Sequence, residues 1–131
     1  MLEVHHSFKT YEGKPLLKDI SLKVDTGETI CLLGASGSGK STLLRIIAGL
    51  EDSDSGFVSF NGVDLTSTPP HLRDFGLVFQ DYALFPHLNV YDNVAFGLKM
   101  RYLHPNEITQ RVAKSLETVN LGGFENRQVT D

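Results

Sequence analysis

A chain of 131 residues, 40% apolar and 21% charged, is long enough for one globular domain and has no low-complexity run typical of a disordered tail. Its net charge of −4, from 12 basic and 16 acidic side chains, disfavours a general nucleic-acid binder. The single cysteine, Cys31, excludes an intrachain disulfide, and the sequence shows neither a run of about 18 apolar residues nor a signal peptide, so a cytoplasmic protein is predicted.

The first third of the chain has the periodicity of strands. Apolar and polar residues alternate over Leu2–Tyr11 and again over Ile20–Val24, with a turn predicted at Glu12–Pro15 between them. Thr29–Leu33 is apolar without alternation, which is typical of a strand covered on both faces in a parallel sheet. Cys31 lies in this run and is expected to be buried.

A glycine-rich stretch follows, and then a helix is predicted. Its apolar residues recur at helical spacing, with Gly49 near the expected end; they are Leu43, Leu44, Ile47 and Leu50. Two short β-prone segments come next, Phe57–Phe60 and Phe75–Phe79, separated by turn-forming residues.

Two further helices are predicted beyond Pro86. In the first, Asn89 is the expected N-cap and one face carries Val90, Val94, Ala95, Leu98 and Tyr102. In the second, Glu107 and Arg111 are paired four residues apart, and one face carries Ile108, Val112, Leu116 and Val119. The order of strands, one strand-loop-helix unit, strands and helices indicates an α/β protein.

The glycine-rich stretch matches the phosphate-binding pattern G-x-x-x-x-G-K-[ST] between a predicted strand and a predicted helix. Glycines let successive N–H groups point at phosphate oxygens, Lys40 reaches the β and γ phosphates, and the Ser41 hydroxyl suits Mg²⁺. A chance match has a probability of roughly one in a hundred. The candidate nucleotide-binding residues are Gly34, Ser36, Gly37, Ser38, Gly39, Lys40, Ser41 and Thr42. These residues alone leave ATP and GTP open.

With this P-loop in place, the whole chain resembles the N-terminal half of an ABC transporter ATPase subunit. The resemblance implies ATP and Mg²⁺ as cofactors. It also implies that Tyr11, upstream of the loop, stacks on adenine, since an aromatic face can cover a base. Without the resemblance, Tyr11 is simply a tyrosine at the end of a strand.

Residues 76–87, GLVFQDYALFPH, resemble the Q-loop region of this family, particularly of importers that work with a binding protein. The resemblance implies that Gln80 contacts Mg²⁺ and the attacking water and links the nucleotide site to the transmembrane partner. It places Phe85, Pro86 and His87 near the surface that receives the permease subunits. The alternative interpretations are a solvated loop glutamine and a local apolar cluster closed by a proline turn.

The implied fold is a P-loop NTPase (RecA-like) core, incomplete, with an N-terminal antiparallel β-subdomain and the start of a helical subdomain. Residues 1–27 and 56–66 would form mainly the β-subdomain, 28–50 and 72–80 the P-loop core, and 81–131 the Q-loop and the start of the helical subdomain. Residues 126–131 resemble the segment that directly precedes the family's LSGGQ signature.

Hydrolysis needs groups beyond the phosphate cradle, and the resemblance assigns them to the signature, an Asp-Glu strand and a switch histidine, none of which is found here. We therefore expect a fragment of a longer subunit, which sits on the inner face of the membrane and forms a head-to-tail dimer. By itself the chain is expected to have negligible turnover, and to self-associate because Thr29–Leu33 lacks its neighbouring strand. The first hypothesis is therefore the ATPase subunit of an importer, and the second is a nucleotide-binding half-domain with negligible turnover. A different P-loop protein, such as a GTPase or kinase, is the third hypothesis. These residues do not identify the transported solute. As an expectation, a metal ion or a polyamine is slightly favoured.

Overall fold

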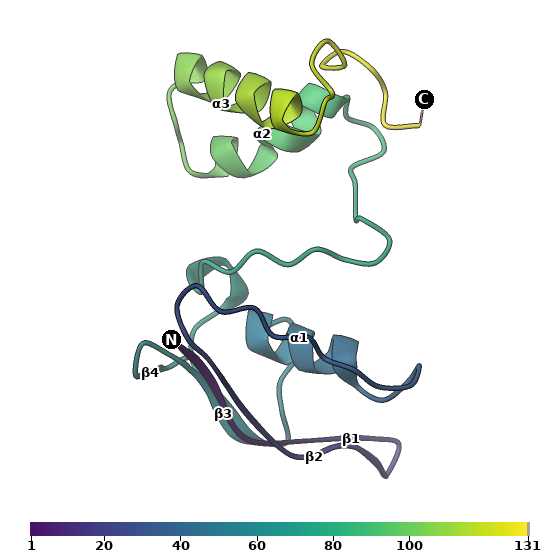
Figure 1. Ribbon diagram of the computed structural model, residues 1–131, viewed down its shortest axis with the longest axis vertical. Helices are drawn as coiled ribbons and strands as arrows, with labels where there is room; N and C mark the ends of the chain where they lie inside the picture. Colours follow the sequence, from purple (N-terminus) through teal and green to yellow (C-terminus); the bar gives the residue numbers. More distant parts are fainter. Residues whose placement is uncertain (131) are drawn as a thin grey trace. The chain divides into compact units, whose positions relative to one another are not determined.

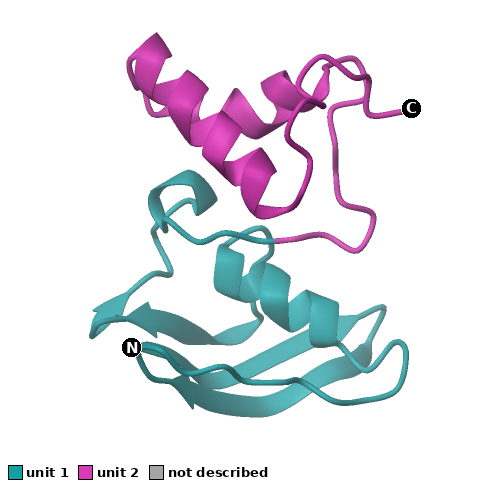
Figure 2. Cartoon of the chain, turned by 45° about the horizontal axis from the view of Figure 1, so that its top comes forward, with its two compact units in different colours: residues 1–77 teal, residues 78–131 magenta. Residues whose placement is uncertain are grey.

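The computed structural model describes residues 1–130; Asp131, the last residue of the segment likened to the one before the signature, lies outside the described residues. The chain divides into two compact units, Met1–Leu77 and the residues from Val78 onward (Figure 2). The finer subdomain boundaries stay a prediction.

The first unit contains a four-stranded antiparallel sheet in the order β2-β1-β3-β4 (Figure 1). Its strands are β1 (Leu2–Tyr11), β2 (Lys14–Val24), β3 (Ser55–Phe60) and β4 (Val63–Asp64). The first predicted strand is confirmed with its bounds. The second begins six residues earlier than Ile20 because the turn needs only Glu12 and Gly13, which both have positive φ, 48° and 76°, as a two-residue hairpin loop requires.

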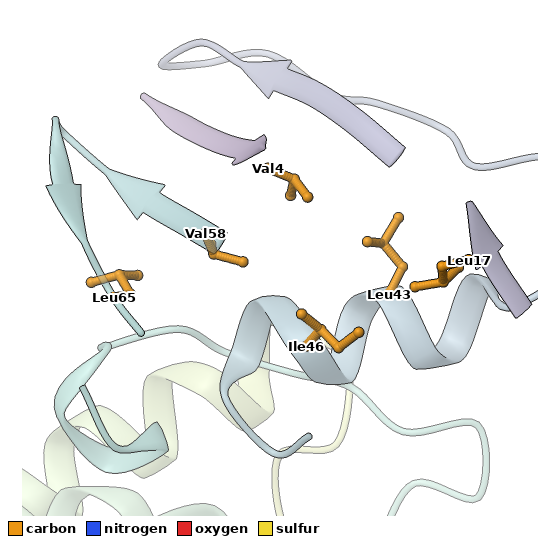
Figure 3. Packing of buried hydrophobic residues seen from close by; sticks show 6 residues of the cluster. All are labelled: Val4, Leu17, Leu43, Ile46, Val58 and Leu65. Atoms are coloured by element: carbon orange, nitrogen blue, oxygen red, sulfur yellow. The ribbon is translucent and has the colours of Figure 1, made fainter. Parts of the chain in front are cut away.

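Helix α1 (Lys40–Ala48) covers one face of this sheet, and Gly49 ends it in the left-handed region with φ 77°, as predicted. Side chains from β1, β2, β3 and α1 meet between the layers (Figure 3). The buried cluster consists of Val4, Leu17, Leu43, Ile46, Val58 and Leu65. Burying a side chain of this size contributes about 1.5 to 3 kcal/mol, so this cluster holds α1 on the sheet.

Two predicted strands are wrong. Thr29–Leu33 and Phe75–Phe79 are irregular, and much of their apolar surface is exposed, including 88% of Leu33 and 86% of Val78. Among residues 1–130, no strand pairs with either segment, and an extended segment without a partner leaves its N–H and C=O groups to water. For the same reason Cys31 is exposed and not buried.

The second unit is built on α2 (Val90–Met100) and α3 (Pro105–Thr118), which pack together through Ala95, Ile108, Val112 and Leu116. Two predicted details are confirmed. Asn89 Oδ1 accepts a hydrogen bond from the N–H of Asp92 at 2.7 Å, and the Glu107 and Arg111 side chains pair at 2.6 Å.

Three residues expected on the apolar faces of these helices are exposed instead: Val94 by 37%, Tyr102 by 95% and Val119 by 60%. The last two are exposed because the helices end at Met100 and Thr118. A short 3₁₀ helix, η1 (Pro70–Leu72), completes the regular structure of residues 1–130. Within that described part of the chain, no helix has the length and apolar character needed to cross a bilayer.

Candidate functional site

The P-loop leads directly into α1. Gly39 is the N-cap with φ 93°, Lys40 is the first helical residue, and no acidic side chain lies in the first turn. The Lys40 ammonium turns back into the loop, where it donates to Gly34 O at 2.8 Å, to Ala35 O at 2.7 Å and to Ser38 Oγ at 3.2 Å. A helix N-terminus with a lysine and without a carboxylate attracts anions, because its free N–H groups and its dipole are positive.

The glycines at both ends of the loop are closely packed. A Cβ on Gly34 would lie 2.6 Å from Ser38 Oγ, and one on Gly39 would lie 2.7 Å from a Leu17 methyl group. Gly37 also has a positive φ, 77°. The end of the loop at Gly39 therefore packs directly against β2.

The donors of this loop fit a magnesium-bound polyphosphate. Ser41 is exposed in the first turn of α1, whereas Thr42 is 8% exposed. Mg²⁺ commonly takes few protein oxygens and completes its shell with phosphate oxygens and water, so a single serine hydroxyl is an adequate protein ligand. In the described residues, no group of three or more His, Cys, Asp or Glu side chains is arranged to hold a metal ion.

Tyr11 lies at the end of β1 and is 44% exposed. Its hairpin partner strand carries Leu16 and Leu17, the two residues nearest to the position of a Cβ on Gly39. The structure thus brings the hairpin that carries Tyr11 against the P-loop.

Gln80 lies in an exposed turn at the start of the second unit, while the P-loop belongs to the first. Its contact with the metal and the attacking water therefore stays a prediction.

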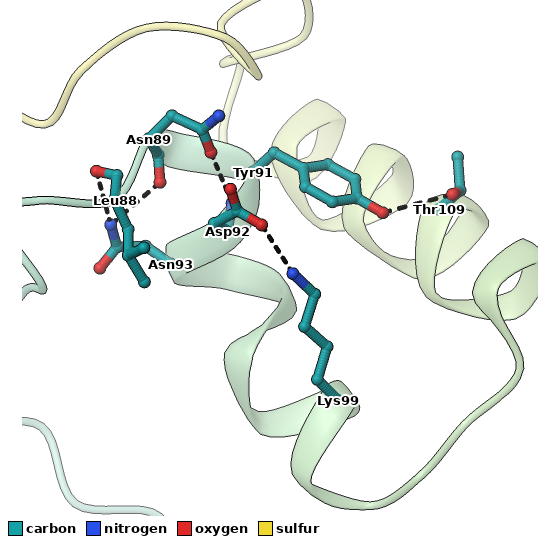
Figure 4. A network of polar contacts seen from close by, with 7 residues as sticks. All are labelled: Leu88, Asn89, Tyr91, Asp92, Asn93, Lys99 and Thr109. Atoms are coloured by element: carbon teal, nitrogen blue, oxygen red, sulfur yellow. Dashed lines mark hydrogen bonds and ion pairs between the residues drawn. The ribbon is translucent and has the colours of Figure 1, made fainter.

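The segment that follows Gln80 is held by a residue that the sequence did not single out, Asn93. Its Oδ1 accepts from the N–H of Phe85 at 2.9 Å, and its Nδ2 donates to three carbonyls, those of Phe85, Leu88 and Asn89, at 3.1, 3.2 and 2.9 Å. Figure 4 shows this amide beside the N-cap residue Asn89. The Phe85 ring also packs on Phe96, with centroids 4.6 Å apart. Phe85, Pro86 and His87 are exposed, but the backbone of Phe85 is anchored to α2.

Arg73 is the second residue that the sequence did not reveal. It is 9% exposed and donates to four carbonyls: Nε to Thr68 at 2.8 Å, Nη1 to Ile46 and Ile47 at 3.1 and 3.0 Å, and Nη2 to Leu65 at 2.9 Å. Burial lowers the pKa of its guanidinium. A lone arginine between Pro69-Pro70 and an apolar segment gives no sequence signal of burial, so only the fold shows that it holds the end of α1.

Comparison with known proteins agrees with this geometry. Residues 17–131 match the family described as ABC transporter. The chain is 47% identical over 131 residues to the spermidine/putrescine import ATP-binding protein PotA of Mesoplasma florum, and 43% identical over 129 residues to that of Clostridium novyi. These alignments cover 100% and 98% of this chain but 37% of each relative, so the chain spans little more than a third of their length.

Two solved structures share the fold. A dimeric ATP-binding cassette in a post-hydrolysis state with ADP and Pi bound matches with a TM-score of 0.87 and 29% identity, over 99% of this chain and 62% of that one. A dimeric bacterial ABC transporter cassette matches with a TM-score of 0.86 and 30% identity, over 98% and 61%. The fold is an incomplete P-loop NTPase core with an antiparallel sheet and the start of a helical subdomain. The P-loop, the fold and the family match together show that this chain belongs to the ABC transporter family.

Proposed function

We propose that this chain is the nucleotide-binding part of an ATP-hydrolysing importer subunit and that it binds MgATP at residues 34–42. The observation that carries the proposal is the Lys40 ammonium, held inside a glycine-lined loop at the positive end of α1. Its bonds to loop carbonyls are exchangeable for bonds to phosphate oxygens, which are stronger acceptors because they are charged.

Each residue of the proposed site has a distinct task. The N–H groups of the loop and Lys40 bind the phosphates, Ser41 offers a hydroxyl to Mg²⁺, and Tyr11 covers the adenine. In the complete subunit, Gln80 would contact the metal and orient the attacking water. Mg²⁺ neutralises phosphate charge when bound, which lowers the barrier to attack on the γ phosphate.

The proposed partners are a second ATPase subunit and transmembrane permease subunits that dock near Phe85, Pro86 and His87. The dimeric state of both solved cassettes supports the first, and the aromatic surface of Phe85 and Phe96, fixed on α2 by Asn93, supports the second. The complete protein would then lie on the cytoplasmic face of the membrane. Two PotA relatives named for spermidine and putrescine import favour a polyamine over a metal ion as the solute.

For the 131-residue chain, we propose nucleotide binding with negligible turnover. The sequence contains no LSGGQ-like run and no apolar segment that ends in Asp-Glu, so the groups that activate water and stabilise the transferred charge are not supplied by these residues.

Titration with MgATP tests the proposal. The chain should bind MgATP more tightly than magnesium tripolyphosphate, because Tyr11 stacks on the base, and should release phosphate no faster than MgATP hydrolyses in buffer alone. A chain that fails to bind MgATP at millimolar concentration contradicts the assignment of the site. A turnover equal to that of a full-length relative contradicts the claim that essential groups are missing.

We also propose that the chain self-associates, because apolar side chains of the two irregular segments, among them Ile30, Leu33 and Val78, are exposed. Light scattering at micromolar concentration should give a mass above that of a monomer, and replacing Leu33 and Val78 by Glu should lower it. A monodisperse wild-type monomer would overturn this part of the proposal.

A further inference from the structure

Lys9 makes an unusual set of contacts for a strand lysine. Its side chain is 15% exposed, and its ammonium donates to Asp52 O at 2.7 Å and lies 3.6 Å from Glu51 Oε1 and 3.7 Å from Asp54 Oδ1. All three partners belong to the short loop between α1 and β3. Lys9 therefore ties the end of β1 to the segment that follows the P-loop helix.

The main chain on both sides of Lys9 is tied to the same loop. The N–H of Asp54 donates to Phe8 O at 2.8 Å, and the N–H of Thr10 donates to Asp54 Oδ2 at 2.7 Å. Three consecutive residues of β1 are thus fixed immediately before Tyr11.

The Lys9 ammonium also lies 5.5 Å from the centroid of the Tyr11 ring. At this distance a cation is attracted to the face of an aromatic ring, which restricts how the ring rotates. Because Glu51 and Asp54 hold the ammonium in place, the ring contact is made by a fixed cation and not by a mobile surface lysine.

Lys9 is also connected to the phosphate site. Its partner in the strand register is Leu17, whose methyl group approaches the position of a Cβ on Gly39 to 2.7 Å. Lys9, which contacts the Tyr11 ring, is therefore the strand partner of Leu17, which lies against Gly39 of the P-loop.

We propose that Lys9 is a positioning residue that holds the Tyr11 ring for stacking on the base of the bound nucleotide. This inference rests on the proposed function, since it needs a nucleotide at the P-loop. With one face of the ring covered by the ammonium, a base stacks on the opposite face without first having to order the side chain.

Comparing a ligand that has a base with a ligand that has none distinguishes positioning of the Tyr11 ring from a merely structural role of Lys9. Binding of MgATP and of magnesium tripolyphosphate is measured by displacement of a fluorescent ATP analogue from the full chain. Lys9→Met should weaken MgATP binding about fivefold, the size of a partly desolvated cation-π contact, and change tripolyphosphate binding less than about twofold. Lys18→Met, an exposed lysine on β2, is the matched control and should change neither.

Tyr11→Ala should bring MgATP binding down to the level of tripolyphosphate, and Lys9→Met should then have no further effect in the double variant. If Lys9→Met fails to fold because Glu51 is left unpaired, Lys9→Met/Glu51→Gln removes both charges and should show the same selective loss.

The outcomes distinguish the two proposals. If the wild-type chain does not bind MgATP, the proposed function fails. If it binds MgATP no better than tripolyphosphate, the base site at Tyr11 fails. If the wild type prefers MgATP and Tyr11→Ala abolishes this preference, but Lys9→Met leaves it intact or weakens both ligands equally, the inference about Lys9 alone is overturned.

Discussion

Helix α1 meets a side-chain cation at each end, and both cations donate to main-chain carbonyls. Lys40 at the N-terminus bonds to Gly34 and Ala35, which lie in its own loop, and remains partly exposed. Arg73 at the C-terminus is 9% exposed and joins two segments, the end of α1 and residues 65–68. The first arrangement can be exchanged for a ligand, because water or phosphate can replace each bond. Breaking the second leaves the partly buried Ile47 and Thr68 carbonyls without a donor.

The helix dipole gives the same two ends opposite roles. A cation at the C-terminus stabilises the helix, whereas the N-terminus, with no acidic residue in its first turn, stays positive and open to an anion. Arg73 would then be a permanent part of the scaffold and Lys40 a part of the binding site. Four variants test this difference.

The largest expected effect is on Arg73. Arg73→Met should lower the free energy of unfolding by about 4 kcal/mol, because it removes four hydrogen bonds and leaves the Ile47 and Thr68 carbonyls without a donor, whereas the Ile46 and Leu65 carbonyls keep the N–H groups of Gly49 and Thr68. Urea unfolding measures the change. Arg45→Met, an exposed arginine on the last turn of α1, is the control and should cost less than about 0.5 kcal/mol. Equal effects of the two variants would mean that Arg73 is not the fixed cation of the pair.

Lys40→Met should affect ligand binding strongly and the free energy of unfolding very little. It should weaken MgATP binding roughly 100-fold, about 3 kcal/mol, because charge-assisted bonds to phosphate are lost. The free energy of unfolding should change by less than about 0.5 kcal/mol, since the loop carbonyls that lose Lys40 can bond to water. Isothermal titration measures the change in MgATP affinity, and urea unfolding measures the change in stability. If Lys40→Met destabilises the chain as much as Arg73→Met does, the proposed difference between the two ends of α1 is wrong.

Gly49→Ala tests the packing of Arg73 against the backbone at the C-terminal end of α1. A Cβ there would lie 2.5 Å from Arg73 Nε, in addition to the strain of φ 77°. Gly13→Ala has nearly the same φ, 76°, and nothing within 4 Å, so it carries the strain without the clash. Gly49→Ala should therefore destabilise the chain by about 2 kcal/mol more than Gly13→Ala, as measured by thermal or urea unfolding. Equal losses would show that Arg73 can move aside.

The smallest effect is expected at Asp64, beside the Leu65 carbonyl that accepts from Arg73. Hydrogen bonds from the Thr66 hydroxyl and N–H lower the pKa of the Asp64 carboxyl. A lowered pKa in the folded state stabilises the fold above the ordinary aspartate pKa of about 3.9 and is lost as the pH falls through the lower folded value.

Thr66→Val removes the hydroxyl bond and should raise the pKa of Asp64 towards its ordinary value, as NMR titration can show. The variant should be slightly less stable than wild type at neutral pH and equally stable in strong acid. A stability difference that persists in acid would assign the effect to packing instead.

Local signals predicted most of the regular structure. Alternation located β1, helical spacing located α1, α2 and α3, and Asn89 was recognised as a cap because its side chain precedes an apolar periodic run. The same signals were wrong for Thr29–Leu33 and Phe75–Phe79, since an apolar run shows only that a segment can form a strand and not that a partner is present. The P-loop pattern could be recognised because it consists of consecutive residues, and phosphate binding by these residues stays a prediction.

By itself, the sequence determined the helices, the hairpin and the phosphate loop, because each depends on residues that are neighbours along the chain. The tertiary structure decided which cations are fixed by contacts with distant segments. Lys9 contacts residues more than 40 positions away, and Arg73 contacts the end of a helix 26 and 27 positions away. Such contacts leave no periodic trace in the sequence, because they depend on how distant segments pack and on which carbonyls that packing removes from water.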